Sequence, residues 1–408
     1  MSHRHILISG AGIAGLGLAH WLRRYGINVT VVERAPGLRG GGQAIDIRGT
    51  AREVITRMGL MDAIRAHHTG TRGIAIVDTD NRRRAAMDAE SFGDSGGIVA
   101  DIEILRGDLV RILHDSAGDS VEYLFDDLIT AMSHTGAGVE VDFARSPTRR
   151  FDAVVGADGL RSGVRRLAFG DDANVVHDLG HYMSYFPAHS ELDFDGWELM
   201  CNIPAGNGVN GRVGVLYPIR DTGEVRALLG FVCPPMDPEP RDVASQKELL
   251  LRVFAGAGWE FPSLMEQLRH TDDVYFARVG EVRVDGWSRG RAVLLGDACC
   301  GGSLGMGTSM ALVGAYVLAG EIATGSDLSA AFASYQEEMR EYAAANMKRP
   351  PGGANGFAPR TRRGIWARTT FMRVLPHLPG AARMFGSIQK NANLITLKDY
   401  ESRSTVAS

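Results

Sequence analysis

The amino-terminal end of the chain has the pattern of a strand, a glycine-rich turn, a helix and a second strand that ends on an acid. A short apolar run over residues 5–9 leads into glycines at positions 10, 12 and 15, and a helical pattern follows over 16–25. A second apolar run over 28–32 ends at Glu33. This order predicts a parallel β–α–β unit whose first turn binds a dinucleotide.

Each glycine has its own physical role in such a turn. Gly10 permits the tight turn, Gly12 lets a pyrophosphate approach the backbone at a helix N-terminus, and Gly15 lets that helix pack closely on the strand. Glu33 can accept hydrogen bonds from an adenosine ribose. A purely structural glycine turn is the alternative, and the agreement of strand, helix and acid favours nucleotide binding. The acid reports only a free ribose diol, so NAD and FAD both stay open here.

Length and composition place the chain among ordinary globular proteins. Its 408 residues are 45% hydrophobic and 23% charged, which is enough to bury a large core in two or more lobes. A formal net charge of -4 gives no broad electrostatic reason to bind nucleic acid or an anionic membrane. No leader precedes the first strand, and no apolar stretch approaches the ~18 residues of a spanning helix. We therefore expect a cytoplasmic monomer or homodimer with no nucleic-acid or membrane partner.

Two later strands also end on an aspartate. An apolar run over 151–157 ends at Asp158 and is followed by a helical pattern that opens at 161–166. Another run over 291–296 ends at Asp297, and a glycine-rich stretch then leads into a helix over 309–324. An aspartate at such a strand end can bind a polyol such as ribitol, while the following helix points N–H groups at an electron-rich edge. Alone, each is more often a solvated strand terminus.

The three motifs together resemble the single-component flavoprotein monooxygenases of the p-hydroxybenzoate hydroxylase type. The resemblance covers nearly the whole chain and is closest to the branch that tailors polyketides and other natural products, antibiotics among them, because residues 305–309 and 349–360 also resemble that branch. It implies an α/β fold with a Rossmann-like FAD-binding domain, a second lobe with an antiparallel sheet, and C-terminal helices. Four strand-like runs between 180 and 233, separated by turn residues, agree with that sheet.

The resemblance also implies a domain division and a set of cofactor contacts. Residues 1–174 and 277–326 would form a discontinuous FAD-binding domain, 175–276 with part of 71–100 the substrate lobe, and 327–408 a C-terminal helical segment. The expected FAD contacts are Gly10, Gly12 and Gly15 at the pyrophosphate, Glu33 at the ribose, Arg34 near the adenine, Gln43 in the glycine-rich loop beside the cofactor, Arg106 and Asp297 at the ribityl chain, Asp158, and the helix entry Gly305, Met306, Gly307 and Thr308. Without the resemblance, Arg106 would be taken for a capping or surface arginine.

The expected activity is hydroxylation or epoxidation of a hydrophobic aromatic or polyketide-type small molecule with NADPH, or NADH, and oxygen. The loop over 298–304 departs from the family pattern, because it is shorter and has no proline, and its two extra glycines predict a more flexible loop. That departure supports an alternative, an FAD-containing enzyme that catalyses a non-redox, [4+2]-type ring closure. A flavin-containing carrier protein is a third and weaker reading. The sequence identifies no catalytic residue.

Candidate substrate contacts come from the strand-like runs of the second lobe. Aromatic, methionine and arginine side chains there could line an apolar pocket, although core packing is the commoner role for any one of them. The candidates are Tyr182, Tyr185, Met200, Arg212, Tyr217 and Phe231.

The cysteines and histidines predict neither a disulfide framework nor a metal site. Four cysteines are too few for a disulfide scaffold in so long a chain, and no histidine clusters with them at a metal-ligand spacing. The adjacent pair Cys299 and Cys300 suits tight packing behind a cofactor, because neighbouring cysteines form only a strained disulfide. A redox pair or a covalent link to the flavin are the alternatives.

Overall fold

A computed structural model describes residues 4–88, 102–170, 175–219, 223–236, 240, 242–303, 305–348, 356–378 and 389–401. The amino-terminal unit forms as the sequence predicts, with β1 (His5–Ser9), α1 (Ile13–Arg24) and β2 (Asn28–Glu33). These strands lie in a six-stranded sheet in the order β17-β18-β11-β1-β2-β7. The other members are β7 (Glu122–Phe125), β11 (Ala153–Gly156), β17 (Ser288–Arg289) and β18 (Ala292–Leu294).

Parallel pairing in this sheet brings the three sequence motifs to one edge. Strand β1 pairs in parallel with β2 on one side and with β11 on the other, and β11 pairs in parallel with β18. Chain order therefore reverses at β1, which is the position where doubly wound sheets bind ligands beyond the carboxyl ends of their strands. The turn after β1, the Asp158 turn after β11 and the Asp297 turn after β18 all lie at that edge.

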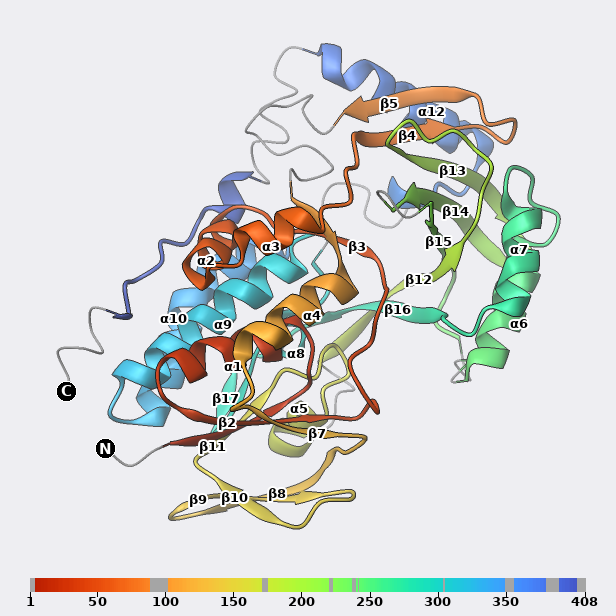
Figure 1. Ribbon diagram of the computed structural model, residues 1–408. Coiled ribbons are helices and arrows are strands. Elements are labelled where there is room, and N and C mark those ends of the chain that lie inside the picture. The colour runs from red at the N-terminus through yellow and green to blue at the C-terminus, as the bar shows by residue number, and fades with distance from the viewer. Residues whose placement is uncertain are drawn as a thin grey trace.

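Helices cover the six-stranded sheet and bury its apolar strands (Figure 1). Helix α9 is buried on nearly every side, because it packs against α1, α2 and α10, and Glu321 is its one charged residue. The helices of this part are α2 (Thr50–Met58), α3 (Met61–Ala66), α4 (Arg106–Ala117), α5 (Gly163–Phe169), α8 (Asp297–Cys300), α9 (Gly307–Thr324) and α10 (Leu328–Asn346). A small antiparallel sheet adds β8 (Ile129–Thr135), β9 (Gly138–Phe143) and β10 (Arg149–Phe151).

The second large sheet has seven strands in the order β16-β12-β15-β14-β13-β4-β5, and all neighbours are antiparallel except β13 and β4. Its strands are β4 (Gly73–Val77), β5 (Arg83–Asp88), β12 (Val176–Ala188), β13 (Trp197–Gly206), β14 (Val209–Pro218), β15 (Val225–Val232) and β16 (Tyr275–Val282). Together the two sheets and their helices confirm the predicted α/β fold. The division into domains at the predicted boundaries stays a prediction.

Alternation along each strand gives the seven-stranded sheet two different faces. The outer face packs against α6 (Val243–Phe254) and α7 (Phe261–His270), which lie outside the sheet in Figure 1. The inner face carries Met200, Val213, Val215 and Tyr217, which pack with Leu105 of the nucleotide-binding part. Helix α12 (Arg362–Val374), followed by the short η3 (Leu375–His377), packs against β5 and β13.

A short antiparallel ladder connects the two large sheets. Strand β3 (Ala44–Asp46) pairs with β6 (Glu103–Leu105), so that Asp46 lies opposite Glu103. The backbone N–H of Ala44 donates to Tyr217 Oη on β14 at 3.2 Å. The ladder therefore holds the inner face of the seven-stranded sheet against the nucleotide-binding part.

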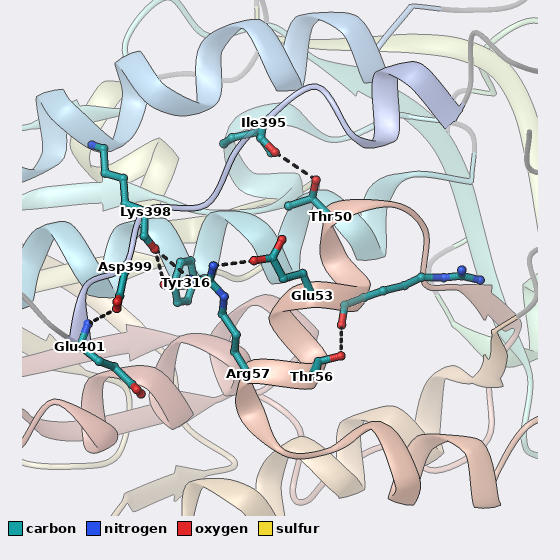
Figure 2. Close-up of polar contacts among 10 residues, drawn as sticks. Thr50, Glu53, Thr56, Arg57, Tyr316, Ile395, Lys398, Asp399 and Glu401 are labelled. Carbon is teal, nitrogen blue, oxygen red and sulfur yellow. Dashed lines mark hydrogen bonds and ion pairs between the residues drawn. The ribbon is translucent and has the colours of Figure 1, made fainter. Parts of the chain in front are cut away.

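The last described residues return to the helices that cover the six-stranded sheet (Figure 2). Thr50 Oγ1 donates to the carbonyl of Ile395 at 3.1 Å, and both Arg57 and Tyr316 Oη donate to the carbonyl of Lys398, at 2.9 and 2.6 Å. The ring of Tyr400 is fully buried against α9, where a Cβ on Gly320 would lie 2.2 Å from it. Among the helices described, none is long and apolar enough to cross a bilayer.

We expect the Tyr400→Ala change to lower the free energy of unfolding by about 3–5 kcal/mol, because it leaves a ring-sized cavity beside α9. Tyr400→Phe keeps the ring and removes only the hydrogen bond to Glu321 Oε1, which is 2.8 Å long, so we expect a loss of about 1 kcal/mol. Urea denaturation of the FAD-loaded protein measures both. The matched control is Tyr275→Ala, since Tyr275 is 41% exposed; equal losses in the two alanine variants would contradict the packing role.

Candidate functional site

The turn after β1 is shaped by two glycines and open at the third. Gly10 has φ of +108°, and a Cβ there would lie 2.6 Å from the carbonyl oxygen of Ala157. A Cβ on Gly15 would lie 2.0 Å from the carbonyl oxygen of Gly10. A Cβ on Gly12, by contrast, meets only Arg106 Nη2, at 3.9 Å. The protein's own packing therefore requires Gly10 and Gly15, whereas Gly12 borders open space at the N-terminus of α1.

Glu33 fastens this turn to the end of β2. Its Oε2 accepts the N–H of Ala11 and its Oε1 accepts the N–H of Ala35, each at 2.9 Å. A carboxylate has acceptor capacity beyond two hydrogen bonds, so the same group can still accept from a ribose diol. Arg34 lies exposed beside it.

Asp158 caps α5 and keeps one oxygen unused. Its Oδ2 accepts the N–H of Gly163 at 2.8 Å and of Val164 at 3.2 Å. Its Oδ1 is buried and has no hydrogen-bond partner among the described residues. Arg165, which the sequence reasoning missed, joins this turn to the third motif, because its guanidinium donates to the carbonyls of Leu160 and Ala298 at 2.7 and 2.8 Å. The only sequence signal for this role of Arg165 was its position on the side of a helix that faces the core.

The carboxyl group of Asp297 is surrounded by protein, but its side chain is still exposed to solvent. Burial by surrounding protein raises the pKa of its carboxyl, and the positive charge of Arg106 opposes that rise. A Cβ on Gly307 would lie 3.7 Å from Asp297 Oδ1 and 3.6 Å from Ser303 Oγ, a buried hydroxyl without a partner in the described part of the chain. Asp297 is therefore an exposed carboxylate beside Arg106 of α4 and the start of α9.

The glycine-rich loop before β3 fixes the position of Arg106. The N–H of Arg106 donates to the carbonyl of Gln43 at 2.9 Å, and the N–H of Gly107 donates to the carbonyl of Gly41 at 2.8 Å. A Cβ on Gly107 would lie 2.5 Å from the nitrogen of Gly41, so only glycine fits where the loop crosses α4. Gln43 thus acts here through its backbone.

The start of α9 offers N–H groups to a ligand. Gly305 has φ of +75°, Met306 is the N-cap, and no side chain caps the helix. The first N–H groups of a helix carry partial positive charge. In α9 they begin with those of Gly307 and Thr308, which lie beside Asp297. Gly12, Arg106, Asp297 and this helix start thus lie near one another at one edge of the sheet. The open backbone at Gly12 could admit a phosphate, Asp297 could accept from a polyol, and the uncapped helix offers N–H donors. The residues present therefore fit FAD.

The loop after β18 is held by packing rather than by proline. Cys299 and Cys300 are buried free thiols whose Sγ atoms lie 3.2 and 3.4 Å from the carbonyl oxygen of Gly296. The N–H of Val282 on β16 donates to the carbonyl of Gly301 at 2.9 Å, and a Cβ on Gly302 would lie 2.5 Å from the oxygen of Gly280. These contacts do not support the looser loop expected from the missing proline. Leu304 lies outside the described residues.

The six predicted substrate contacts divide between the two faces of the seven-stranded sheet. Met200, Tyr217 and Tyr185 belong to the inner face, and Tyr185 and Tyr217 lie close enough to interact electrostatically. Tyr182 lies on the outer face, where its ring stacks on Phe231 at 5.2 Å, and Arg212 donates to the carbonyl of Val253 on α6 at 2.9 Å. Neighbouring residues on a strand point to opposite faces. The outer face therefore holds Tyr182, Phe231 and Arg212, which pack under α6 and α7. In this position they face away from the ladder, contrary to the prediction that they contact substrate.

Three carboxyl groups that the sequence reasoning missed lie between the ladder and the inner face. Glu198 of β13 hydrogen-bonds to Glu103 of β6, and burial raises the pKa of both. Thr71 Oγ1 donates to Glu103 Oε2 at 2.6 Å. Asp46 forms an ion pair with Arg48 at 2.7 Å and lies 4.0 Å from the position of a Cβ on Gly305. The raised pKa values favour retention of a proton by the Glu103–Glu198 pair, which lies next to Asp46.

In the described ranges, no group of three or more histidine, cysteine, aspartate or glutamate side chains is arranged to hold a metal ion.

Replacing Glu33 tests the first turn. We expect Glu33→Ala to weaken FAD binding by about 1–3 kcal/mol, because the N–H groups of Ala11 and Ala35 lose their acceptor. Glu33→Gln retains one amide oxygen and should show a smaller loss. Equilibrium dialysis of the protein with FAD measures the dissociation constant, with the exposed Glu140→Ala as control. Wild-type affinity in Glu33→Ala would contradict the role.

Replacing Glu198 tests the shared proton. A folded protein that keeps a proton which the unfolded chain releases loses stability as pH rises, here from the ordinary carboxyl pKa of 4.5 toward the raised pKa of the pair. Glu198→Gln cannot titrate and still donates an N–H to Glu103, so its free energy of unfolding should fall less between about pH 5 and about pH 8. Urea denaturation at both pH values, beside the exposed Glu191→Gln, measures this. An unchanged slope would show that the pair holds no extra proton.

Comparison with known proteins agrees with the geometry of this candidate FAD site. The family model described as FAD binding domain matches residues 4–350. A flavin-dependent monooxygenase from an unknown prokaryotic organism is 33% identical over 97% of this chain and 99% of its own length. The uncharacterized protein Rv1260 of Mycobacterium tuberculosis is 42% identical over 86% of this chain and 94% of its own length. The crystal structure of the tetracycline destructase Tet(55) superposes with a TM-score of 0.77 at 31% identity, over 98% of this chain and all of that one. This chain therefore belongs to the FAD-binding-domain family of flavin-dependent monooxygenases, with FAD as its cofactor.

Proposed function

We propose that this monooxygenase uses NADPH or NADH and oxygen to hydroxylate or epoxidise an aromatic or polyketide-type small molecule. The observation that carries the proposal is the inner face of the seven-stranded sheet, which carries Tyr185, Met200 and Tyr217 and packs against the ladder. Large apolar side chains with a few convergent polar groups are typical of sites for small hydrophobic ligands. The likeness to a tetracycline destructase supports a fused-ring substrate for this chain.

Bound FAD supplies the electron transfer from the nicotinamide and the insertion of one oxygen atom. The protein's own part begins at α9, where Gly307 and Thr308 at the uncapped helix start would hold an edge of the cofactor through their N–H groups and stabilise negative charge on it. Tyr217 Oη accepts the N–H of Ala44, which holds the inner face of the seven-stranded sheet against the glycine-rich loop. Tyr185 and Tyr217 on that face would keep bulk water away from the reacting ring.

The Glu103–Glu198 pair, whose pKa values are raised, would supply a proton-donating group on this side of the sheet. Asp46, Tyr185 and Tyr217 surround the pair, and Asp46 is neutralised in part by Arg48. A carboxyl group that stays protonated near neutral pH can donate a hydrogen bond to a substrate oxygen or return a proton during oxygen insertion. We assign that donor role to Glu198.

The alternative of a non-redox cyclase has no specific observation in its favour. Its weight came from the shortened loop after Asp297, and that loop packs closely on β16.

The decisive experiment follows nicotinamide oxidation and oxygen uptake by the FAD-loaded enzyme with a panel of fused-ring phenols and polyketides. We expect one compound class to accelerate nicotinamide oxidation, with matching oxygen uptake and one atom of labelled oxygen in the product. Heat-treated enzyme and enzyme without substrate are the controls. Conversion of a panel compound in the absence of oxygen, with oxidised FAD and no nicotinamide, would contradict the proposal and favour ring closure.

A further inference from the structure

Arg368 of α12 carries a charge that the described part of the protein does not neutralise. Its Nη1 donates to Asn202 Oδ1 at 2.5 Å, and its Nη2 donates to Met200 Sδ at 3.2 Å. Burial lowers its pKa to about 10, with no carboxylate acting in the opposite direction. A guanidinium has five N–H donors, and an amide oxygen and a thioether satisfy few of them.

Other arginines in similar positions have stronger partners. Arg48 pairs with Asp46 at 2.7 Å, and Arg226 lies 3.4 Å from Asp273. Arg212 donates to two backbone carbonyls. A poorly compensated cation is unfavourable in such surroundings unless a ligand completes it. Arg368 therefore lacks the compensation that these partners provide, and a bound anion would supply it.

A cavity of about 480 Å³ lies beside Arg368. The described residues of its lining are Asn210, Pro359, Arg360, Gly364 and Arg368, and none of these side chains is acidic. The backbone around Arg360 is fixed, because its carbonyl accepts the N–H of Ala205 on β13 at 2.8 Å. Two guanidinium groups thus border one cavity on a fixed segment.

The position of the cavity relates it to the substrate side of the protein. Glu198, Met200 and Asn202 follow one another on the same face of β13, each about 7 Å from the next. Glu198 meets the ladder near α9, and Arg368 contacts the next two residues of that row. The same inner face therefore leads from the proposed site of oxygen insertion to Arg368.

We propose that Arg368, assisted by Arg360, binds an anionic oxygen group of a ligand, either an acidic group of the substrate or a phosphate of the nicotinamide cosubstrate. The inference rests on the proposed function for what those ligands are, but not for the existence of the site. A planar guanidinium presents paired donors to a carboxylate, enolate or phosphate, and the cavity has room for the group that carries it.

The test uses FAD-loaded wild-type protein and the variants Arg368→Met, Arg368→Lys and Arg360→Met. Arg373→Met is the matched control, because Arg373 lies exposed on the same helix. Titration calorimetry measures the binding of salicylate, of its neutral analogue salicylamide, and of NADPH and NADH. FAD content and thermal unfolding show whether each variant is folded.

A substrate-acid site predicts at least a tenfold weaker salicylate affinity in Arg368→Met, partial recovery in Arg368→Lys, and unchanged salicylamide affinity. A site for the 2′-phosphate predicts that loss for NADPH and not for NADH, whereas a site for the diphosphate predicts it for both. If Arg368→Met does not fold, Arg368→Lys and Arg360→Met must show a smaller loss of the same selectivity. Affinities unchanged in the folded variants, or no binding of any of the four probes by the wild type, would overturn the inference.

These readouts need no turnover, so the two proposals fail separately. Selective loss of anion binding, together with no oxygen-dependent conversion of any compound, would remove the proposed function and leave the site. Normal turnover with unchanged binding in every Arg368 variant would remove the anion site and leave the proposed function.

Discussion

The parallel register around β1 is the constraint on which the site depends. Ser9 pairs with Val32 on one side and with Gly156 on the other, and Gly156 pairs with Leu294. Those pairings place the turns that follow at one edge of the sheet, although the three strands come from distant parts of the chain. Arg165 reinforces this edge by bonding to the carbonyls of Leu160 and Ala298. A shift of one register would separate the cofactor contacts and reverse the faces of each strand.

Local pattern predicted the nucleotide-binding part well, because each motif carries its own chemistry within a few residues. The second lobe shows where such reasoning ends. The strand that contains Tyr182 and Tyr185 was predictable from composition, but which side meets the cofactor depends on where α6 and α7 pack. The Glu103–Glu198 contact and the seat of Tyr400 on α9 join segments far apart in the sequence, and no local signal predicts them.

The loop after Asp297 shows that one physical requirement can be met in two ways. The family pattern uses proline to restrict the backbone, and its absence here predicts freedom. In this chain the turn of α8 instead sets two thiols against the carbonyl of Gly296, while Gly301 accepts a hydrogen bond from β16 and Gly302 fits where no side chain could. Close packing thus restricts the loop from outside, which sequence reasoning about chain stiffness does not capture.

The two ends of the row of side chains on the inner face of β13 carry opposite charge. This difference bears on how a substrate would be oriented. Glu198 and Glu103, whose pKa values are raised, lie next to Asp46, whereas Arg368 lies at the other end of the row beyond Met200. A molecule with an anionic group would meet like charge at the carboxyl end and opposite charge at the arginine end. Under the proposed function, its uncharged, electron-rich ring would then be the part that faces the nucleotide-binding part. The same asymmetry disfavours the reversed orientation, so one row of side chains would set both binding and the position of oxygen insertion.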